Sequence, residues 1–137
     1  MTASKTLTFS IMDGPFEQAR TVTAMRLIDG AIRSGYNVNV FAYEGAVALP
    51  FAKQQKHANA VHGRDLEEED HPLTREWISS LFMLAKKCGV TLDWINCGLC
   101  VDERGMEEVI EGCRRGSPAD LWKCAMDSDN TLIIGTR

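Results

Sequence analysis

A strand, a helix and a second strand follow one another at the start of the chain, and this succession restricts the fold more than any other feature. Residues 6–12 alternate and are rich in β-branched side chains, which predicts a strand. Residues 16–34 repeat apolar side chains at helical spacing, and Gly35 follows where helices commonly end. Residues 38–43 form a second apolar run. Because strands joined through a helix lie parallel in one sheet, the sequence predicts a parallel α/β fold.

The middle of the chain repeats this alternation. Residues 45–51 are apolar and suit a short helix. We expect Pro72 and a capping Thr74 to begin a long helix that Gly89 ends. Residues 90–95 are then predicted to form the third strand.

The last part of the chain supplies a further helix and strand. Residues 117–120, Ser-Pro-Ala-Asp, combine a cap, a proline and a carboxylate in the order typical of a helix start. This helix is predicted to run to about Asp127, with a final strand over residues 131–135. The prediction is one domain over residues 1–137, a three-layer α/β/α sandwich with a mainly parallel sheet.

Composition narrows the classes of function. The chain has 15 basic and 19 acidic residues and a formal charge of −4, which disfavours direct nucleic-acid binding because phosphate backbones are anionic. No targeting segment and no membrane-length apolar run are visible, so we expect a cytoplasmic protein that does not bind membranes. Five cysteines, an odd number, argue against a disulfide framework and favour thiols that are buried or reactive.

The motif C-G-L-C at residues 97–100 directly follows the third predicted strand. In an open α/β sheet, reactive groups gather beyond the carboxyl ends of strands, where this motif and the loop containing Asp13 and Gly14 are both expected. A thiolate is favoured by a helix N-terminus or a nearby cation, and Arg104 is the predicted cation. Glycines such as Gly98 let backbone N–H groups approach an anion.

Other interpretations of the cysteines stay open at this stage. The motif suits two buried structural cysteines, or a thioredoxin-like oxidoreductase. Structural zinc is a weaker interpretation, because it needs four ligands and no second cysteine pair is present. We expect no metal and no cofactor. Cys88 and Cys124 are predicted to face the core, and Cys113 is the alternative reactive thiol. All three histidines fall in a polar stretch, residues 53–71, that is predicted to be a surface loop.

The motif and its flanks resemble a known family. C-G-L-C-V-D-E-R-G at residues 97–105 is similar to the cysteine box of YchN-like proteins of the DsrE superfamily. Residues 11–16 and 41–47 resemble the first and second strand exits of DsrE, and residues 129–135 its last strand. Cys97 precedes an Arg-Gly pair by the spacing seen in DsrE and TusD proteins, whereas Cys100 has a counterpart only in the YchN-like branch.

The resemblance implies a DsrE-like intracellular sulfurtransferase. Such a protein would hold sulfane sulfur as a persulfide on Cys97 or Cys100 and exchange it with a TusA-like carrier, in sulfur oxidation or a sulfur relay. It also implies a homo-oligomer, a trimer or hexamer. We expect Gly98, Arg104, Asp13 and Gly14 to support the cysteines. Two alternatives remain: a redox switch based on a Cys97–Cys100 disulfide, and a non-catalytic scaffold subunit of a sulfur-relay complex.

Overall fold

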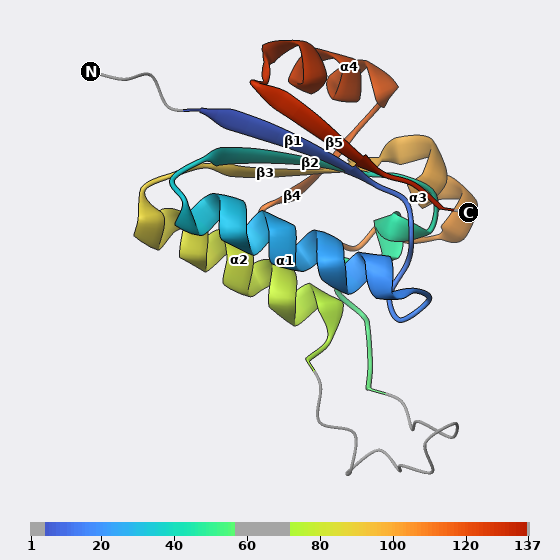
Figure 1. The fold of residues 1–137 in the computed structure, drawn as a ribbon. Coiled ribbons are helices and arrows are strands. Elements are labelled where there is room, and N and C mark those ends of the chain that lie inside the picture. Colours follow the sequence, from blue (N-terminus) through green and yellow to red (C-terminus); the bar gives the residue numbers. More distant parts are fainter. Residues whose placement is uncertain (1–4, 57–71, 137) are drawn as a thin grey trace.

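The computed structural model describes residues 5–56 and 72–136 (Figure 1). Within this part of the chain, five parallel strands form one sheet in the order β4-β3-β2-β1-β5. The strands β1 to β5 are Thr6–Ile11, Asn37–Ala42, Leu92–Cys97, Cys113–Gly116 and Asn130–Ile134. The helices α1 to α4 are Ala19–Arg33, Thr74–Cys88, Gly98–Arg104 and Pro118–Asp127, and a short 3-10 helix, η1, spans Glu44–Ala48.

The elements form three layers, as the sequence predicts. Helices α1 and α2 cover one face of the sheet, and α4 lies on the other (Figure 1). The short elements η1 and α3 lie at the edge where the strands end, on the right of the same view. The fold class is therefore confirmed, and the carboxyl edge of the sheet is where the loops that follow β1, β2 and β3 meet.

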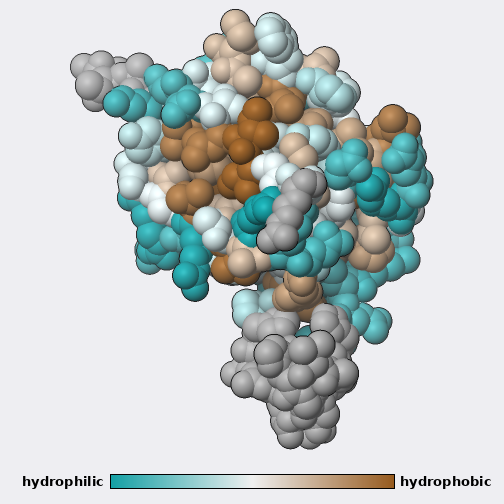
Figure 2. Space-filling model, turned by 45° about the vertical axis from the view of Figure 1, so that its right-hand side comes forward, coloured by the Kyte–Doolittle hydropathy of each residue, from teal (hydrophilic) through white to brown (hydrophobic). Residues whose placement is uncertain are grey.

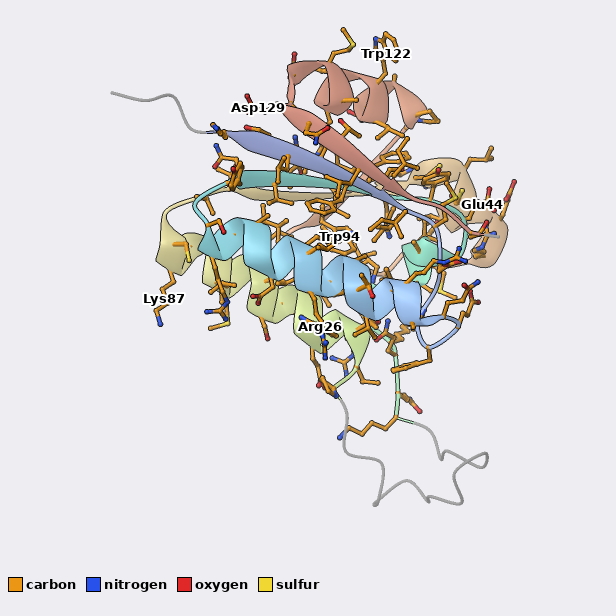
Figure 3. The ribbon with its side chains drawn as sticks, viewed as in Figure 1. Arg26, Glu44, Lys87, Trp94, Trp122 and Asp129 are labelled. Carbon is orange, nitrogen blue, oxygen red and sulfur yellow. The ribbon has the colours of Figure 1, made fainter. Side chains whose placement is uncertain are left out.

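Two apolar clusters hold the layers together. The larger cluster lies between the sheet and the helices α1 and α2; it includes Trp94, which Figure 3 shows between the sheet and these helices. The smaller cluster includes Phe41, Ile95, Cys97 and Cys100. Because β2 and β3 contribute to both clusters, the central residues of these strands are apolar toward both faces of the sheet: Val40 and Phe41 in β2, and Trp94 and Ile95 in β3.

The fourth strand, Cys113–Gly116, escapes sequence-based prediction. Its sequence is C-R-R-G, which lacks the β-branched and aromatic residues that mark strands. Its ladder partner is β3, with Trp94 opposite Cys113 and Cys97 opposite Gly116. Tertiary pairing rather than local propensity therefore makes this segment a strand, and it brings two arginines beside the cysteine motif.

Helix α2 differs from its prediction in two details. Thr74 is not the cap: Leu73 holds that position, and the Thr74 hydroxyl donates a hydrogen bond of 2.9 Å to the Leu49 carbonyl. Cys88 is exposed rather than in the core, because it lies in the last helical turn beyond Ala85, the last buried residue of the helix. The other boundaries differ by a few residues; α1 begins at Ala19 rather than at residue 16.

Apolar side chains remain on the surface of the described chain. None of the residues of α4 is buried, and Trp122 and Met126 of this helix are 70% and 65% exposed. Ile133 of the edge strand β5 is 68% exposed. Brown, apolar side chains gather on the face shown in Figure 2. Among the described residues, no helix has the length and apolar character needed to cross a bilayer.

Candidate functional site

Both cysteines of the motif lie at the junction of β3 and α3. Cys97 is the last residue of the strand and also the cap residue of the helix, and Cys100 lies in the first turn of that helix. Their side chains are 6% and 7% exposed and pack with Phe41 and Ile95. Leu99 between them is 67% exposed. The local turn therefore directs the two thiols inward together, while the residue between them faces solvent.

The loop after β2 supplies a hydrogen bond to Cys100. The backbone N–H of Glu44 donates to the Cys100 Sγ at 3.2 Å. Glu44 has a φ of 51°, a left-handed conformation that residues other than glycine seldom adopt. This conformation is held by the surrounding contacts, and strained backbone of this kind is concentrated at functional sites.

The environment of Cys100 keeps its proton on. Burial raises the pKa of the Cys100 thiol, the Glu44 N–H opposes that rise, and a hydrogen bond with Cys97 raises the pKa further. A buried thiol beside a second sulfur is disfavoured as a thiolate because both effects penalise the added charge. Cys100 is therefore protonated at neutral pH.

Arg104, the predicted cation for Cys97, makes its contacts with Glu44 and with the backbone of Cys100. One guanidinium nitrogen of Arg104 pairs with the Glu44 Oε2 at 3.0 Å, and the other donates to the Cys100 carbonyl at 3.4 Å. Glu44 is labelled beside α3 in Figure 3. Arg104 therefore ties α3 to the loop after β2, and its contribution is to position the Glu44 N–H that reaches Cys100.

A different arginine lies against the motif. Arg115 of β4 rests on Gly98, since a Cβ atom at residue 98 would lie 2.6 Å from the Arg115 Nε and 2.8 Å from its Cζ. Two bonds of 2.8 and 2.7 Å hold its Nη1 and Nη2 against the carboxylate of Asp102. The Arg115 pKa is raised, first by this hydrogen bonding and then by the charges of Asp102, Glu107 and Cys97. The absence of a side chain at Gly98 therefore leaves the space that the Arg115 guanidinium group occupies.

Arg115 was not predicted as a site residue, because its segment was not predicted to be a strand. In the sequence, two arginines beside a cysteine indicate solvent-exposed charges. Only the pairing of β4 with β3 in the sheet places Arg115 against the motif. The available signal was the short C-R-R-G segment between the motif and the next helix start, at the length expected of a strand in a strand–helix alternation.

Asp13 and Gly14 occupy the exit of β1, two strands away from β3. Strand spacing places them about 10 Å from the end of β3. Asp13 is 7% exposed, and its Oδ2 has no hydrogen-bond partner among the described residues. Gly14 contacts Gly45, because a Cβ on Gly14 would lie 3.0 Å from the Gly45 carbonyl oxygen. Gly14 therefore contacts the loop that carries Glu44, and this loop in turn contacts Cys100.

Cys113 and Cys124 are both partly buried thiols outside the motif. Burial raises the pKa of Cys113 to about 12, so this thiol is protonated at neutral pH. Burial also raises the pKa of Cys124, which is partly buried on α4 and packs against the smaller apolar cluster. The histidines of residues 57–71 lie outside the described residues. Among residues 5–56 and 72–136, no three metal-binding side chains converge.

Comparison with known proteins supports the fold. No family model matches the chain. The uncharacterized protein MJ0989 of Methanocaldococcus jannaschii is 26% identical over 129 residues, covering 93% of this chain and 97% of that protein. The crystal structure of the YchN protein from E. coli matches with a TM-score of 0.73 at 15% identity, over 95% of this chain and 99% of YchN. A conserved protein of unknown function from Bacteroides thetaiotaomicron, BT1422, matches with a TM-score of 0.58 at 12% identity, over 95% of each chain. The chain therefore has the fold of YchN.

Proposed function

We propose that this chain is a sulfurtransferase that carries sulfane sulfur as a persulfide on its cysteine pair. The observation that carries the proposal is the placement of Cys97 and Cys100 side by side at the carboxyl edge of β3, with the Glu44 N–H donating to one sulfur. This backbone donor opposes the rise in the Cys100 pKa, and so favours the thiolate that Cys100 must form to attack a persulfide on Cys97. The YchN-like fold and the C-G-L-C motif support the same function.

The environments of the two thiols suggest different roles for them. Burial raises the pKa of Cys100, which serves as the second thiol, and Cys97, the last residue of β3, serves as the nucleophile. In the loading step, the Cys97 thiolate attacks the outer sulfur of a donor persulfide, R–S–SH. A new S–S bond forms on Cys97, the donor S–S bond breaks, and the donor leaves as R–S⁻, with no net oxidation.

The unloading step uses the same exchange in reverse. A thiolate of a TusA-like carrier attacks the outer sulfur of the Cys97 persulfide and leaves the Cys97 thiolate behind. Alternatively, Cys100 attacks the inner sulfur of that persulfide, which releases the outer sulfur as hydrosulfide and forms a Cys97–Cys100 disulfide. The surface beside the motif carries exposed Leu99 and the acidic side chains of Glu103 and Glu107. Such a surface suits a partner that presents basic side chains.

We also propose that the protein is a homo-oligomer, either a trimer or a hexamer. The exposed apolar residues of α4 and β5 support this proposal, because large apolar side chains on a surface commonly mark a contact. Light scattering coupled to size-exclusion chromatography measures the oligomer mass. A monomer at all concentrations would remove this part of the proposal and leave the sulfur chemistry untouched.

Intact-protein mass spectrometry after incubation with polysulfide or thiosulfate tests the function. A sulfur carrier gains the mass of one or more sulfur atoms, and a reducing agent removes this mass. The Cys97→Ser variant should lose most of the gain. Cys88→Ser is the matched control, because Cys88 is an exposed thiol on α2 outside the motif and its removal should leave the site loaded.

The same experiment separates the two alternative functions. A redox switch loses only two hydrogen atoms on oxidation and gains no sulfur. A scaffold gains no sulfur and keeps its partner binding in both the Cys97→Ser and the Cys100→Ser variants. If wild-type protein gains no sulfur from either donor, the proposed function is wrong.

A further inference from the structure

A backbone donor of the loop after β2 is directed at Cys100, the thiol that does not hold the transferred sulfur in the proposed function. The Glu44 N–H donates to the Cys100 Sγ over 3.2 Å. A hydrogen bond to a sulfur atom favours the charged form of that thiol over the neutral form. Because the persulfide is proposed to form on Cys97, this donor serves a step in which Cys100 itself reacts.

Two contacts hold the Glu44 N–H in this position. The Arg104 guanidinium group bridges the two segments, since it pairs with the Glu44 carboxylate at 3.0 Å and donates to the Cys100 carbonyl at 3.4 Å. Further along the loop, the Ala46 N–H donates to the Met12 carbonyl at 2.9 Å. Glu44 itself keeps a left-handed φ of 51°, a conformation that persists where surrounding contacts enforce it. The loop is therefore built to present this N–H to Cys100.

Burial of the pair favours a reaction between the two cysteines of one chain. Cys97 and Cys100 are 6% and 7% exposed, and their thiols share a hydrogen bond. The thiol of another protein must open this packing to reach a persulfide on Cys97, whereas Cys100 already lies beside it. Groups that are held together react as if each were present at a very high concentration. A small product also leaves such a site more easily than a protein thiol enters it.

We propose that Cys100 unloads the sulfur from Cys97 as hydrosulfide, and that Arg104 and Glu44 position Cys100 for this step. This inference rests on the proposed function and deepens it, because it selects one of the two unloading routes. Cys100 is then a catalytic residue, since its sulfur reacts. Arg104 and Glu44 are positioning residues, since they act through Cys100. The product is free hydrosulfide rather than a persulfide on a carrier protein.

The unloading step balances without an outside oxidant or reductant. Cys97–S–S⁻ and Cys100–SH yield the Cys97–S–S–Cys100 disulfide and HS⁻. The Cys100 sulfur attacks the inner sulfur, the bond between the inner and outer sulfurs breaks, and the Cys100 proton goes to the outgoing sulfur. The outer sulfur is reduced to sulfide while the two cysteine sulfurs are oxidised. The reaction that follows is a thiol–disulfide exchange with a dithiol reductant, which restores both thiols.

Intact-protein mass spectrometry on samples quenched with acid at successive times tests the route, with inorganic polysulfide as the sulfur donor. Wild-type protein should first carry an added sulfur atom. After the polysulfide is removed on a desalting column, the protein should lose this atom and two hydrogen atoms besides, while a sulfide electrode records the hydrosulfide released. Cys100→Ser should load equally, keep its sulfur and lose the hydrosulfide release.

Two substitutions test the positioning role. Arg104→Gln and Glu44→Ala each break the partly exposed pair that holds the Glu44 N–H, so each should slow hydrosulfide release about two- to fivefold and move the pH midpoint of release upward. Charge alone predicts opposite signs for the two variants. Loss of a cation disfavours the Cys100 thiolate, whereas the Glu44 carboxylate raises the pKa of Cys100, and its loss favours the thiolate.

Arg33→Gln and Asp29→Ala are the matched controls. Arg33 and Asp29 form an ion pair of 2.6 Å on α1, so the two substitutions remove the same charges as the pair of test substitutions. Neither residue belongs to the motif or to the loop after β2. Both control variants should release hydrosulfide at the wild-type rate, and circular dichroism should show all the variants folded.

The outcomes distinguish this inference from the proposed function. Sulfur that stays equally long on wild-type protein and on Cys100→Ser overturns the inference and leaves the proposed sulfur carrier in place. Sulfur that loads wild-type protein but not Cys100→Ser also overturns it, because Cys100 would then hold the sulfur. Rate changes of opposite sign in Arg104→Gln and Glu44→Ala overturn the positioning role. If neither wild-type protein nor Cys100→Ser gains sulfur, the proposed function itself is wrong.

Discussion

Replacing Gly98 by alanine is the sharpest test of the contact between α3 and β4. The added methyl group would lie 2.6, 2.8 and 2.9 Å from the Nε, Cζ and Nη2 atoms of Arg115. Ordinary contact between such atoms begins near 3.5 Å, so the guanidinium group must retreat by about 1 Å. Because these atoms end a flexible side chain, the retreat disturbs the pair with Asp102 but not the backbone.

The expected change in stability is the balance of two small terms. Alanine is preferred to glycine in a helix by up to about 1 kcal/mol, and Gly98 has no positive φ that would oppose the substitution. The pair of Arg115 and Asp102 is exposed, with side-chain exposures of 56% and 48%, so losing it costs up to about 1 kcal/mol. Gly98→Ala alone should therefore change the free energy of unfolding by less than about 1 kcal/mol.

A double-mutant cycle isolates the contact. In an Arg115→Ala background the added methyl group meets no guanidinium group. Gly98→Ala should then raise the free energy of unfolding by the full difference in helix propensity between alanine and glycine. The coupling free energy between the two substitutions is then expected to be about 0.5–1 kcal/mol, measured by urea unfolding followed by circular dichroism. Gly30→Ala is the control, because Gly30 is an exposed helical glycine with nothing within 4 Å of the added methyl group, and its gain should be the same in both backgrounds.

Two results would refute this reasoning. Equal effects of Gly98→Ala in the two backgrounds would mean that Arg115 does not rest on Gly98 in solution. A loss of more than about 2 kcal/mol from Gly98→Ala alone would mean that the methyl group meets something less yielding than a side-chain end, as an overpacked site does.

Three further predictions concern the same region. Gly116→Ala should lower the free energy of unfolding by about 1–3 kcal/mol in urea titrations, because the new Cβ would overlap the Ile95 Cγ2; an unchanged midpoint would contradict this packing. Hydrogen bonding to Arg115 lowers the pKa of Asp102, so this carboxylate contributes stability above its unfolded pKa of about 4 and loses it as the pH falls through the lower folded value. An NMR titration should show the Asp102 midpoint return to the ordinary range in Arg115→Gln. Burial raises the pKa of Cys113 to about 12, so native protein at neutral pH should leave this thiol unlabelled by iodoacetamide until urea unfolds the chain.

Sequence reasoning predicted the layered fold because its signals are local. The alternation of apolar strands with helices of 3.6-residue period, and the glycines at residues 35 and 89 with positive φ, are properties of short segments. The capping residues at 117–120 also act over one turn: the Ser117 N–H donates to the Asp120 carboxylate at 2.8 Å. Each of these features forms without reference to the rest of the molecule.

The cysteine motif was predicted as a site, but its surroundings were only partly predictable. That the thiols follow β3 is evident from the order of elements. Which arginine contacts Gly98 of the motif depends on a strand pairing, and sequence distance favoured Arg104 over Arg115. The short strand that carries Arg115 has no local strand signal, because its two arginines are tolerated only at a sheet edge where they pair with Asp93 and Asp102.

The amino-acid sequence alone therefore determined the layers, the helix boundaries near their glycines and the position of the two thiols at a strand end. Only the tertiary structure decided that Glu44 donates to Cys100, that Arg104 is turned toward Glu44, and that Arg115 lies over Gly98. The physical reason is range. Helical periodicity and capping act between residues a few positions apart, whereas these contacts join residues 13 to 60 positions apart, which meet only when the strands pair in the sheet.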